Sequence, residues 1–375
     1  MKQAIFNNVK NIWGWKTKRK ILVLSIDDYG NVRLDSKSSR EKMNKARLKV
    51  RSRFDTFDTL ETKEDLERLF ETLTSVKDKK GRHAILTAFA LPCNIDFEKI
   101  SAEKYFKYDY ELLPITFKKL SARDPIAYEG TWDLWKEGIA NDLMIPQYHG
   151  REHLNIKVLE EKLKNNDKEV YTAFKTRSYT SISNSGYKTI NYTAAFDFWD
   201  PSENIGLSNI LIDGINQFQN VFGYRPVHFM PPTSNIHASL FPIIKGEGIK
   251  YMDTNLIHKQ HQGFGKYKTS YNFTGKRVKS GNKYIVRNVV FEPTVNKGID
   301  WVGYSLDQIE AAFRWNRPAI LSSHRVNFCG YIDPKNRLTG ITALYNLLKK
   351  VVARWPDVEF MSANELGDLI TKSNN

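Results

Sequence analysis

Short apolar segments alternate with amphipathic helical patterns along most of this chain, and this alternation limits its fold more than any other feature. The expected strands are residues 21–26, 84–90, 143–148, 226–230, 249–252, 319–323 and 357–361. The expected helices between them carry clear boundary signals, such as the capping box of Ser305 and Gln308. Strands that alternate with helices form a mainly parallel sheet. The sequence therefore predicts an α/β fold, and the length of 375 residues allows one large domain or two smaller ones.

Three stretches depart from this pattern. Residues 1–20 form a basic N-terminal extension, and residues 21–375 are expected to form the domain. Within the domain, residues 91–140 make a long connection rich in aromatic and charged side chains. Residues 255–288 alternate polar and aromatic side chains around glycines, which favours a β-hairpin. Long connections at one end of a parallel sheet commonly build active sites.

The N-terminal extension lacks the apolar core of a signal peptide. Ile5, Val9, Ile12 and Trp13 fall on one side of a short amphipathic stretch. We expect this stretch to pack on the domain, with contact with a membrane surface as the alternative. No segment approaches the ~18 uninterrupted apolar residues that a membrane span requires.

Net charge and cysteine content limit which partners the protein is expected to bind and in which cellular compartment it is expected to lie. The net charge is +15, from 57 Lys and Arg against 42 Asp and Glu, so the surface attracts polyanions such as nucleic acid, anionic lipid, acidic glycan or nucleotide-linked sugars. The basic residues are interspersed with acidic ones and form no nucleic-acid motif, so nucleic acid is not an expected partner. The two cysteines, Cys93 and Cys329, make no disulfide framework. We expect a cytoplasmic protein, with the inner membrane surface left open.

The strand at residues 21–26 runs directly into two adjacent carboxylates, Asp27 and Asp28. Neighbouring like charges raise each other's cost of ionisation unless a cation lies close by. An ordinary polar turn after a strand is the alternative. The pair therefore indicates either a turn or a cation site.

Two histidines follow the expected strand at residues 143–148. His149 and His153 stand at i and i+4, so on a helical turn they share a face, roughly 5–6 Å apart at Cβ, and can bind one metal. A pair of surface histidines is the alternative. If the sheet is parallel, these histidines and Asp28 lie at the same edge. Asp28 then completes a three-ligand set with open coordination positions, which is typical of a catalytic metal site.

A third strand end carries His324, followed by Arg325 and Asn327. Histidine titrates near neutral pH and can give or accept a proton. A histidine that serves capping or core packing is the alternative. Its position at a strand end nevertheless places it at the expected edge of the sheet.

These motifs, in this order, resemble the polysaccharide deacetylase (NodB-homology) family of carbohydrate esterases. The order is strand-Asp-Asp, His-x-x-x-His, a strand running into Pro-Pro, and Leu-x-x-His. The resemblance implies a distorted (β/α)7 barrel with insertions at about 91–140 and 255–288. It further implies the following site: Asp27 as the base, Asp28, His149 and His153 as ligands of a divalent metal with Zn²⁺ as first choice, and His324 as the acid.

The sequence departs from this family at the residue that orients the base. An arginine normally precedes the two prolines, and Met230 occupies that position here. Arg151, Arg287 or Arg325 is expected to supply the cation instead, unless the base is tuned differently.

Two further departures indicate a divergent member with a distinct substrate or impaired chemistry. Gly150 follows the first metal-motif histidine, where the family has Ser or Thr. The acidic residue that orients the acid histidine is not obvious, and Glu292 and Asp253 are the alternatives.

The implied function is metal-dependent hydrolysis of an N-acetyl or related acyl group on a sugar or glycan intermediate of surface polysaccharide biosynthesis. The substrate is expected to be nucleotide- or lipid-linked. Residues near the site that are expected to contact it, with structural salt bridges as the alternative, are Arg151, Glu292, Arg325 and Asn327. A non-catalytic protein that binds glycan or anionic lipid on the same fold is the other hypothesis. Retention of both Asp27 and His324 favours the enzyme, because a binding protein needs neither base nor acid.

Overall fold

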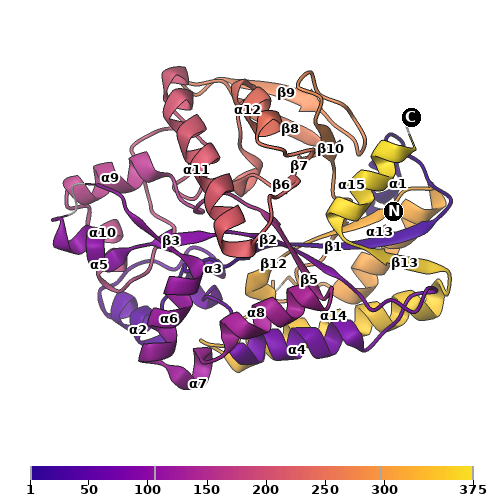
Figure 1. Cartoon of the computed structure of the whole chain (residues 1–375), viewed down its shortest axis with the longest axis horizontal. Coiled ribbons are helices and arrows are strands. Elements are labelled where there is room, and N and C mark those ends of the chain that lie inside the picture. Colours follow the sequence, from indigo (N-terminus) through magenta and orange to yellow (C-terminus); the bar gives the residue numbers. More distant parts are fainter. Residues whose placement is uncertain (1, 105–106, 296, 374–375) are drawn as a thin grey trace.

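A parallel β-sheet forms the centre of the molecule (Figure 1). The computed structural model describes residues 2–104, 107–295 and 297–373. The strands of this sheet are β1 (Lys20–Tyr29), β2 (Leu86–Ala90), β5 (Met144–Tyr148), β6 (His228–Phe229), β7 (Tyr251–Asp253), β10 (Lys283–Ile285), β11 (Val289–Val290), β12 (Ala319–His324) and β13 (Val358–Met361). They run in the order β10-β7-β6-β5-β2-β1-β12-β11, with β13 paired to β1. Every pairing within the sheet is parallel, so the predicted α/β class is confirmed.

The sheet curls into a barrel whose two end strands come close together. These end strands, β10 and β11, are joined by only residues 286–288, a connection that spans at most about 14 Å. One inner apolar cluster also contains Ile285 from β10 and Ile320 from β12, although these strands stand far apart in the strand order. The distorted barrel is therefore confirmed, with eight strands in the row.

Strand β1 is buried on both faces because it lies between two layers. Leu22 and Leu24 point into the large core cluster, and Ile21 and Val23 point into the inner cluster. Leu366 of α15 (Ala363–Lys372) also belongs to the inner cluster. This arrangement explains why the strand reads as a continuous apolar run rather than an alternating one.

Helices cover the outside of the sheet. The longer ones are α4 (Lys63–Thr74), α6 (Leu113–Arg123), α8 (Thr131–Ala140), α11 (Asn204–Phe222), α13 (Trp301–Arg314) and α14 (Pro334–Arg354). The shorter ones are α1 (Lys2–Val9), α2 (Lys37–Lys45), α3 (Phe54–Phe57), α5 (Phe97–Ala102), α7 (Pro125–Tyr128), α9 (Ile156–Lys164), α10 (Lys168–Lys175) and α12 (Phe241–Gly246). In Figure 1, α4, α8 and α14 lie along one side of the sheet. Their buried leucines, together with Trp135 of α8, close the large core.

Both long connections contain structure of their own. Residues 91–140 hold α5 to α8 and an antiparallel pair of short strands, β3 (Cys93–Ile95) and β4 (Tyr110–Leu112). Residues 255–288 contain the hairpin of β8 (Ile257–His261) and β9 (Tyr267–Tyr271), as predicted. That these segments are insertions relative to a family remains a prediction.

The N-terminal extension lies against the domain, as expected. Helix α1 packs beside α13, and β1 begins at Lys20, the last residue of the extension. Among the residues that the structure describes, no helix has the length and apolar character needed to cross a membrane.

Candidate active site

The backbone at the end of β1 turns its two carboxylates toward different partners. Asp28 adopts a left-handed backbone conformation, with φ of 74°, which is uncommon for a residue other than glycine. The pairing of β1 with β2 also shifts register between Ile26 and Tyr29. As a result, Asp27 faces Arg287 whereas Asp28 faces His149 and His153.

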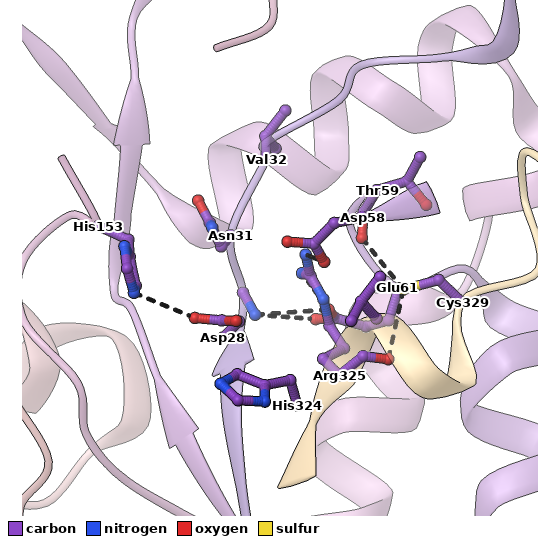
Figure 2. A network of polar contacts seen from close by, with 12 residues as sticks. Asp28, Asn31, Val32, Asp58, Thr59, Glu61, His153, His324, Arg325 and Cys329 are labelled. Carbon is purple, nitrogen blue, oxygen red and sulfur yellow. Dashed lines mark hydrogen bonds and ion pairs between the residues drawn. The ribbon is translucent and has the colours of Figure 1, made fainter. Parts of the chain in front are cut away.

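Asp28 and the two histidines form a cluster that fits a metal ion. Asp28 Oδ1 lies 3.2 Å from His149 Nε2 and 3.3 Å from His153 Nε2, and one ligand atom from each residue falls within 4.8 Å of the others. Figure 2 shows the His153 ring pointing at the Asp28 carboxylate. One carboxylate and two imidazoles are a donor set that suits a divalent transition metal.

Hydrogen bonding at His149 supports this fit. His149 Nδ1 lies 2.7 Å from the carbonyl oxygen of Met230, and because a carbonyl only accepts, Nδ1 must carry the proton. In the neutral ring, Nε2 then presents a lone pair toward Asp28. The lone pair of His149 Nε2 and the carboxylate oxygen of Asp28 would then face each other as two acceptors. A cation bound between them would remove this repulsion. A partner on the far nitrogen that fixes the ring in this way is typical of metal-ligating histidines.

Burial and neighbouring charges determine the protonation states of His153 and Asp28. Burial lowers the pKa of His153 to about 4, so its ring is neutral near pH 7. Burial alone would raise the pKa of Asp28, but the neighbouring histidines hold it well below its usual range. A neutral imidazole and an ionised carboxylate are the forms in which these groups bind metal.

The segment that carries both histidines is not helical, contrary to the sequence-based expectation. Residues 149–155 form a loop, and α9 begins only at Ile156. Gly150 adopts φ of 114°, which side chains disfavour, and a Cβ there would lie 3.2 Å from Pro232 Cγ. The loop still brings the ring centroids of His149 and His153 to 5.1 Å. The i, i+4 spacing therefore pointed to two histidines that do lie together, although the segment is a loop and not a helical turn.

Arg287 is the cation beside Asp27. Its Nη1 and Nη2 donate to Oδ2 and Oδ1 of Asp27, each at 2.7 Å, and its Nε donates to Asp253 at 2.5 Å. Asp253 in turn lies 2.6 Å from His228 Nε2. Arg287 belongs to residues 286–288, the short connection that closes the barrel. Of the three arginines considered from the sequence, only Arg287 contacts Asp27.

His324 lies next to Asp27 across the sheet and is held by Glu292. The two residues are register partners of β12 and β1, and His324 Nδ1 lies 2.6 Å from Glu292 Oε1. Burial alone would lower the pKa of His324, but Glu292, Asp28 and Asp27 raise it to about 9. Of the two acidic residues considered from the sequence, Glu292 contacts His324, and Asp253 contacts Arg287 instead.

The four residues expected to contact the substrate are not among the residues that line the cavity of the site. Arg325 is fully buried and pairs with Asp58 at 2.7 Å and Glu61 at 2.9 Å, behind Asp28 (Figure 2). Arg151 pairs with Glu152 at 2.7 Å and Asp213 at 2.8 Å. Both arginines balance buried carboxylates, which is the structural alternative considered for them.

Glu292 and Asn327 contact His324 but do not line the cavity. Asn327 Nδ2 donates to Glu292 Oε2 at 2.8 Å, and Arg53 also pairs with Glu292. These contacts fix the carboxylate that holds His324. Glu292 thus links His324 to Asn327.

A cavity of about 560 Å³ opens above these groups. It is lined by Asp27, Asp28, His149, His153, His324 and Arg287 together. Lining residues that the sequence analysis missed are Arg33, Phe54, Ser181, Asn191, Thr193, Thr233, Ser234 and Asn255. They lie mostly in loops without a periodic pattern, so the sequence offered no signal for them.

Comparisons with known proteins give similar solved structures only. No family model matches the chain, and no curated protein matches it. A structure described as a polysaccharide deacetylase from Mycobacterium smegmatis is 12% identical, with TM-score 0.46, and the match covers 96% of this chain and 94% of that one. A second structure so described, from Pseudomonas aeruginosa PAO1, is 11% identical, with TM-score 0.45 and coverages of 94% and 91%. An allantoinase is 12% identical, with TM-score 0.45 and the same coverages. The family indicated by the sequence motifs is thus named among these structures, and no residue role is transferred from them.

Proposed function

We propose that this protein is a metal-dependent hydrolase that removes an N-acetyl or related acyl group from a sugar or glycan. One observation carries the proposal. Five side chains from three separated parts of the chain line one cavity in three distinct settings: a three-residue cluster, a carboxylate paired with arginine, and a histidine paired with glutamate. These settings suit a metal, a base and an acid respectively.

Asp28, His149 and His153 would hold the divalent cation, with Zn²⁺ as the first choice for this donor set. When bound, such a cation supplies Lewis acidity that polarises a carbonyl and lowers the pKa of water. The left-handed backbone at Asp28 and the Met230 carbonyl orient two of the three ligands.

Asp27 and His324 would move the protons. In hydrolysis, water adds its oxygen to the acyl carbon, the C–N bond breaks, and the products are a carboxylate and an amine. Asp27 accepts a proton from the water, with Arg287 fixing the direction of its oxygens. His324 donates a proton from Nε2 to the departing nitrogen, since Nδ1 is occupied by Glu292.

The polar lining of the cavity supports a sugar as the substrate. Ser181, Asn191, Thr193 and Arg33 line the cavity, and sugar hydroxyls pair with polar side chains of these types. A role in surface polysaccharide assembly in the cytoplasm is part of this proposal.

The test measures acetate release from N-acetylglucosamine oligomers by the purified protein before and after chelation, and after Zn²⁺ is restored. We expect release that chelation abolishes and Zn²⁺ restores. Asp27→Asn and His324→Gln should each lose at least 100-fold in kcat, whereas Asp133→Asn, which changes an exposed carboxylate on α8, should match the wild type. Metal-free protein that releases nothing from a panel of N-acetylated sugars, yet binds them, would support the binding protein instead.

A further inference from the structure

Helix α1 and the turn after it, residues 2–13, bury two asparagines and leave large apolar side chains exposed to solvent. Asn7 and Asn11 are buried, at 3% and 2% exposure, whereas Ile5, Phe6 and Trp13 are exposed by 57%, 55% and 62%. A surface helix normally does the opposite and buries its apolar stripe. Clustered exposed apolar side chains of this kind mark an interaction surface.

Polar contacts hold α1 and the turn after it in this orientation. Asn11 Oδ1 accepts from Asn288 Nδ2 at 2.8 Å, and Lys10 Nζ donates to Gln308 at 2.8 Å. Arg317 donates to the carbonyls of Asn11 at 2.9 Å and Ile12 at 2.5 Å. The outward direction of the apolar face is therefore specified by the fold.

A second cavity, of about 200 Å³, lies between this extension and the barrel. Its apolar lining includes Phe6, Trp13, Trp15, Phe273, Val286 and Pro318. It shares Leu256, Arg287 and Val290 with the first cavity. The two cavities are thus neighbours that meet at Arg287, which pairs with the proposed base.

Positive charge in the second cavity is uncompensated. Lys10 and Arg317 line it, no Asp or Glu lines it, and neither cation has a carboxylate partner among the described residues. Desolvation lowers the pKa of both groups, that of Lys10 to about 8. Arg287, in contrast, is balanced by Asp27 and Asp253. An anion beside Lys10 and Arg317 would remove this imbalance.

We propose that the second cavity and the outward face of α1 bind a lipid-linked sugar, in which a phosphate joins an apolar chain to the sugar. The phosphate pairs with Lys10, the first part of the chain lies among the aromatic side chains, and the sugar reaches the first cavity. A volume of about 200 Å³ is smaller than the ~300 Å³ of pockets that enclose a drug-sized ligand. The rest of the chain therefore continues past Phe6 and Trp13 into a membrane surface. This inference rests on the proposed function only for the identity of the sugar.

The first experiment tests the surface by sedimentation with vesicles. We expect the protein to bind vesicles of phosphatidylcholine with 30% phosphatidylglycerol, and Phe6→Ser/Trp13→Ser to bind at least tenfold more weakly. Ile126→Ser is the matched control, because Ile126 is 95% exposed on α7, away from α1 (Figure 1). Absence of wild-type binding, or equal binding by the double variant, would overturn the membrane part of the proposal.

The second experiment tests the cavity with octyl phosphate, a monomeric phosphate with an apolar chain, by calorimetry. We expect binding at least tenfold tighter than that of inorganic phosphate or uridine diphosphate, and a tenfold loss in Lys10→Gln with unchanged thermal unfolding. Tighter binding of uridine diphosphate would replace the lipid-linked sugar by a nucleotide-linked one. Equal affinity for inorganic phosphate and octyl phosphate would contradict a site for an apolar lipid chain. Neither experiment depends on catalysis, so an inactive protein that binds octyl phosphate would refute the proposed function alone.

Discussion

Asp27 and Asp28 are neighbours in the chain, yet each pairs with a different part of the barrel. The left-handed backbone of Asp28 sends its carboxylate to the histidines, while the Asp27 carboxylate is held by both guanidinium nitrogens of Arg287. At the scale of residues, this separation is what the proposed function requires, with Asp28 as a metal ligand and Asp27 as the proton acceptor.

Arg287 is expected to be essential to both stability and activity. Arg287→Met removes ion pairs to Asp27 and Asp253, both of which are nearly fully buried, so we expect a loss of about 3–5 kcal/mol in the free energy of unfolding. Urea unfolding measures this loss. The control Arg68→Met removes only exposed pairs with Glu64 and Glu71, and should cost at most about 1 kcal/mol. Equal losses in the two variants would contradict the role of Arg287.

The pH profile of activity should reveal the pairing of His324 with Glu292. Because the pKa of His324 is raised to about 9, its proton is present below that pH and lost as the pH rises through it. Activity should therefore fall on the alkaline side near pH 9. Glu292→Gln removes the negative charge that raises the pKa of His324. The alkaline limb of the activity profile should therefore move to lower pH by about one to two units. Glu310→Gln is the control and should leave the alkaline limb unchanged. If Glu292→Gln also leaves it unchanged, the pairing with Glu292 does not set the pKa of His324.

At the scale of elements, several strand ends were predictable, but the loops that complete the site were not. Strand β5 ends at Tyr148 as expected and is followed by His149. Strand β1 continues past the expected end to Tyr29, and β12 ends at His324, so Asp28 and His324 lie in the last residues of their strands. The helical turn at 149–155 was wrong because Gly150 imposes a left-handed backbone, which spacing alone does not show. The pairing of Arg287 with Asp27 joins residues 260 apart in the chain, so no local pattern singled it out from two other arginines.

The loop of residues 149–155 should tolerate no side chain at Gly150. Its φ of 114° and the 3.2 Å approach to Pro232 mean that Gly150→Ala strains the segment between the two histidine ligands. We expect Zn²⁺ affinity to fall at least tenfold, as measured by calorimetry. Gly206→Ala is the control, because Gly206 is helical and a Cβ there meets nothing within 4 Å. Unchanged affinity in Gly150→Ala would show that the loop does not position the ligands.

At the scale of the whole molecule, closure of the barrel assembles the site. Residues as distant as Asp27 and His324 become register partners, and the connection at 286–288 joins the two end strands of the curled sheet and carries Arg287. The succession of strands and helices in the sequence predicted the class of fold. It also predicted that polar residues would gather at the carboxyl-terminal edge of the sheet. The polar lining of the cavity and the inverted face of α1 depend on tertiary packing, and so could not be derived from periodicity.

The most direct test of this account is a calorimetric titration of metal-free protein with Zn²⁺. We predict one ion bound per chain, and at least a 100-fold loss of affinity in Asp28→Asn and in His149→Gln. His83→Gln changes a histidine whose ring nitrogens lie beside the backbone carbonyls of Ala84 and Asn141, and this variant should bind as the wild type does. No binding by the wild type, or equal binding by the ligand variants, would contradict a metal centre at Asp28, His149 and His153.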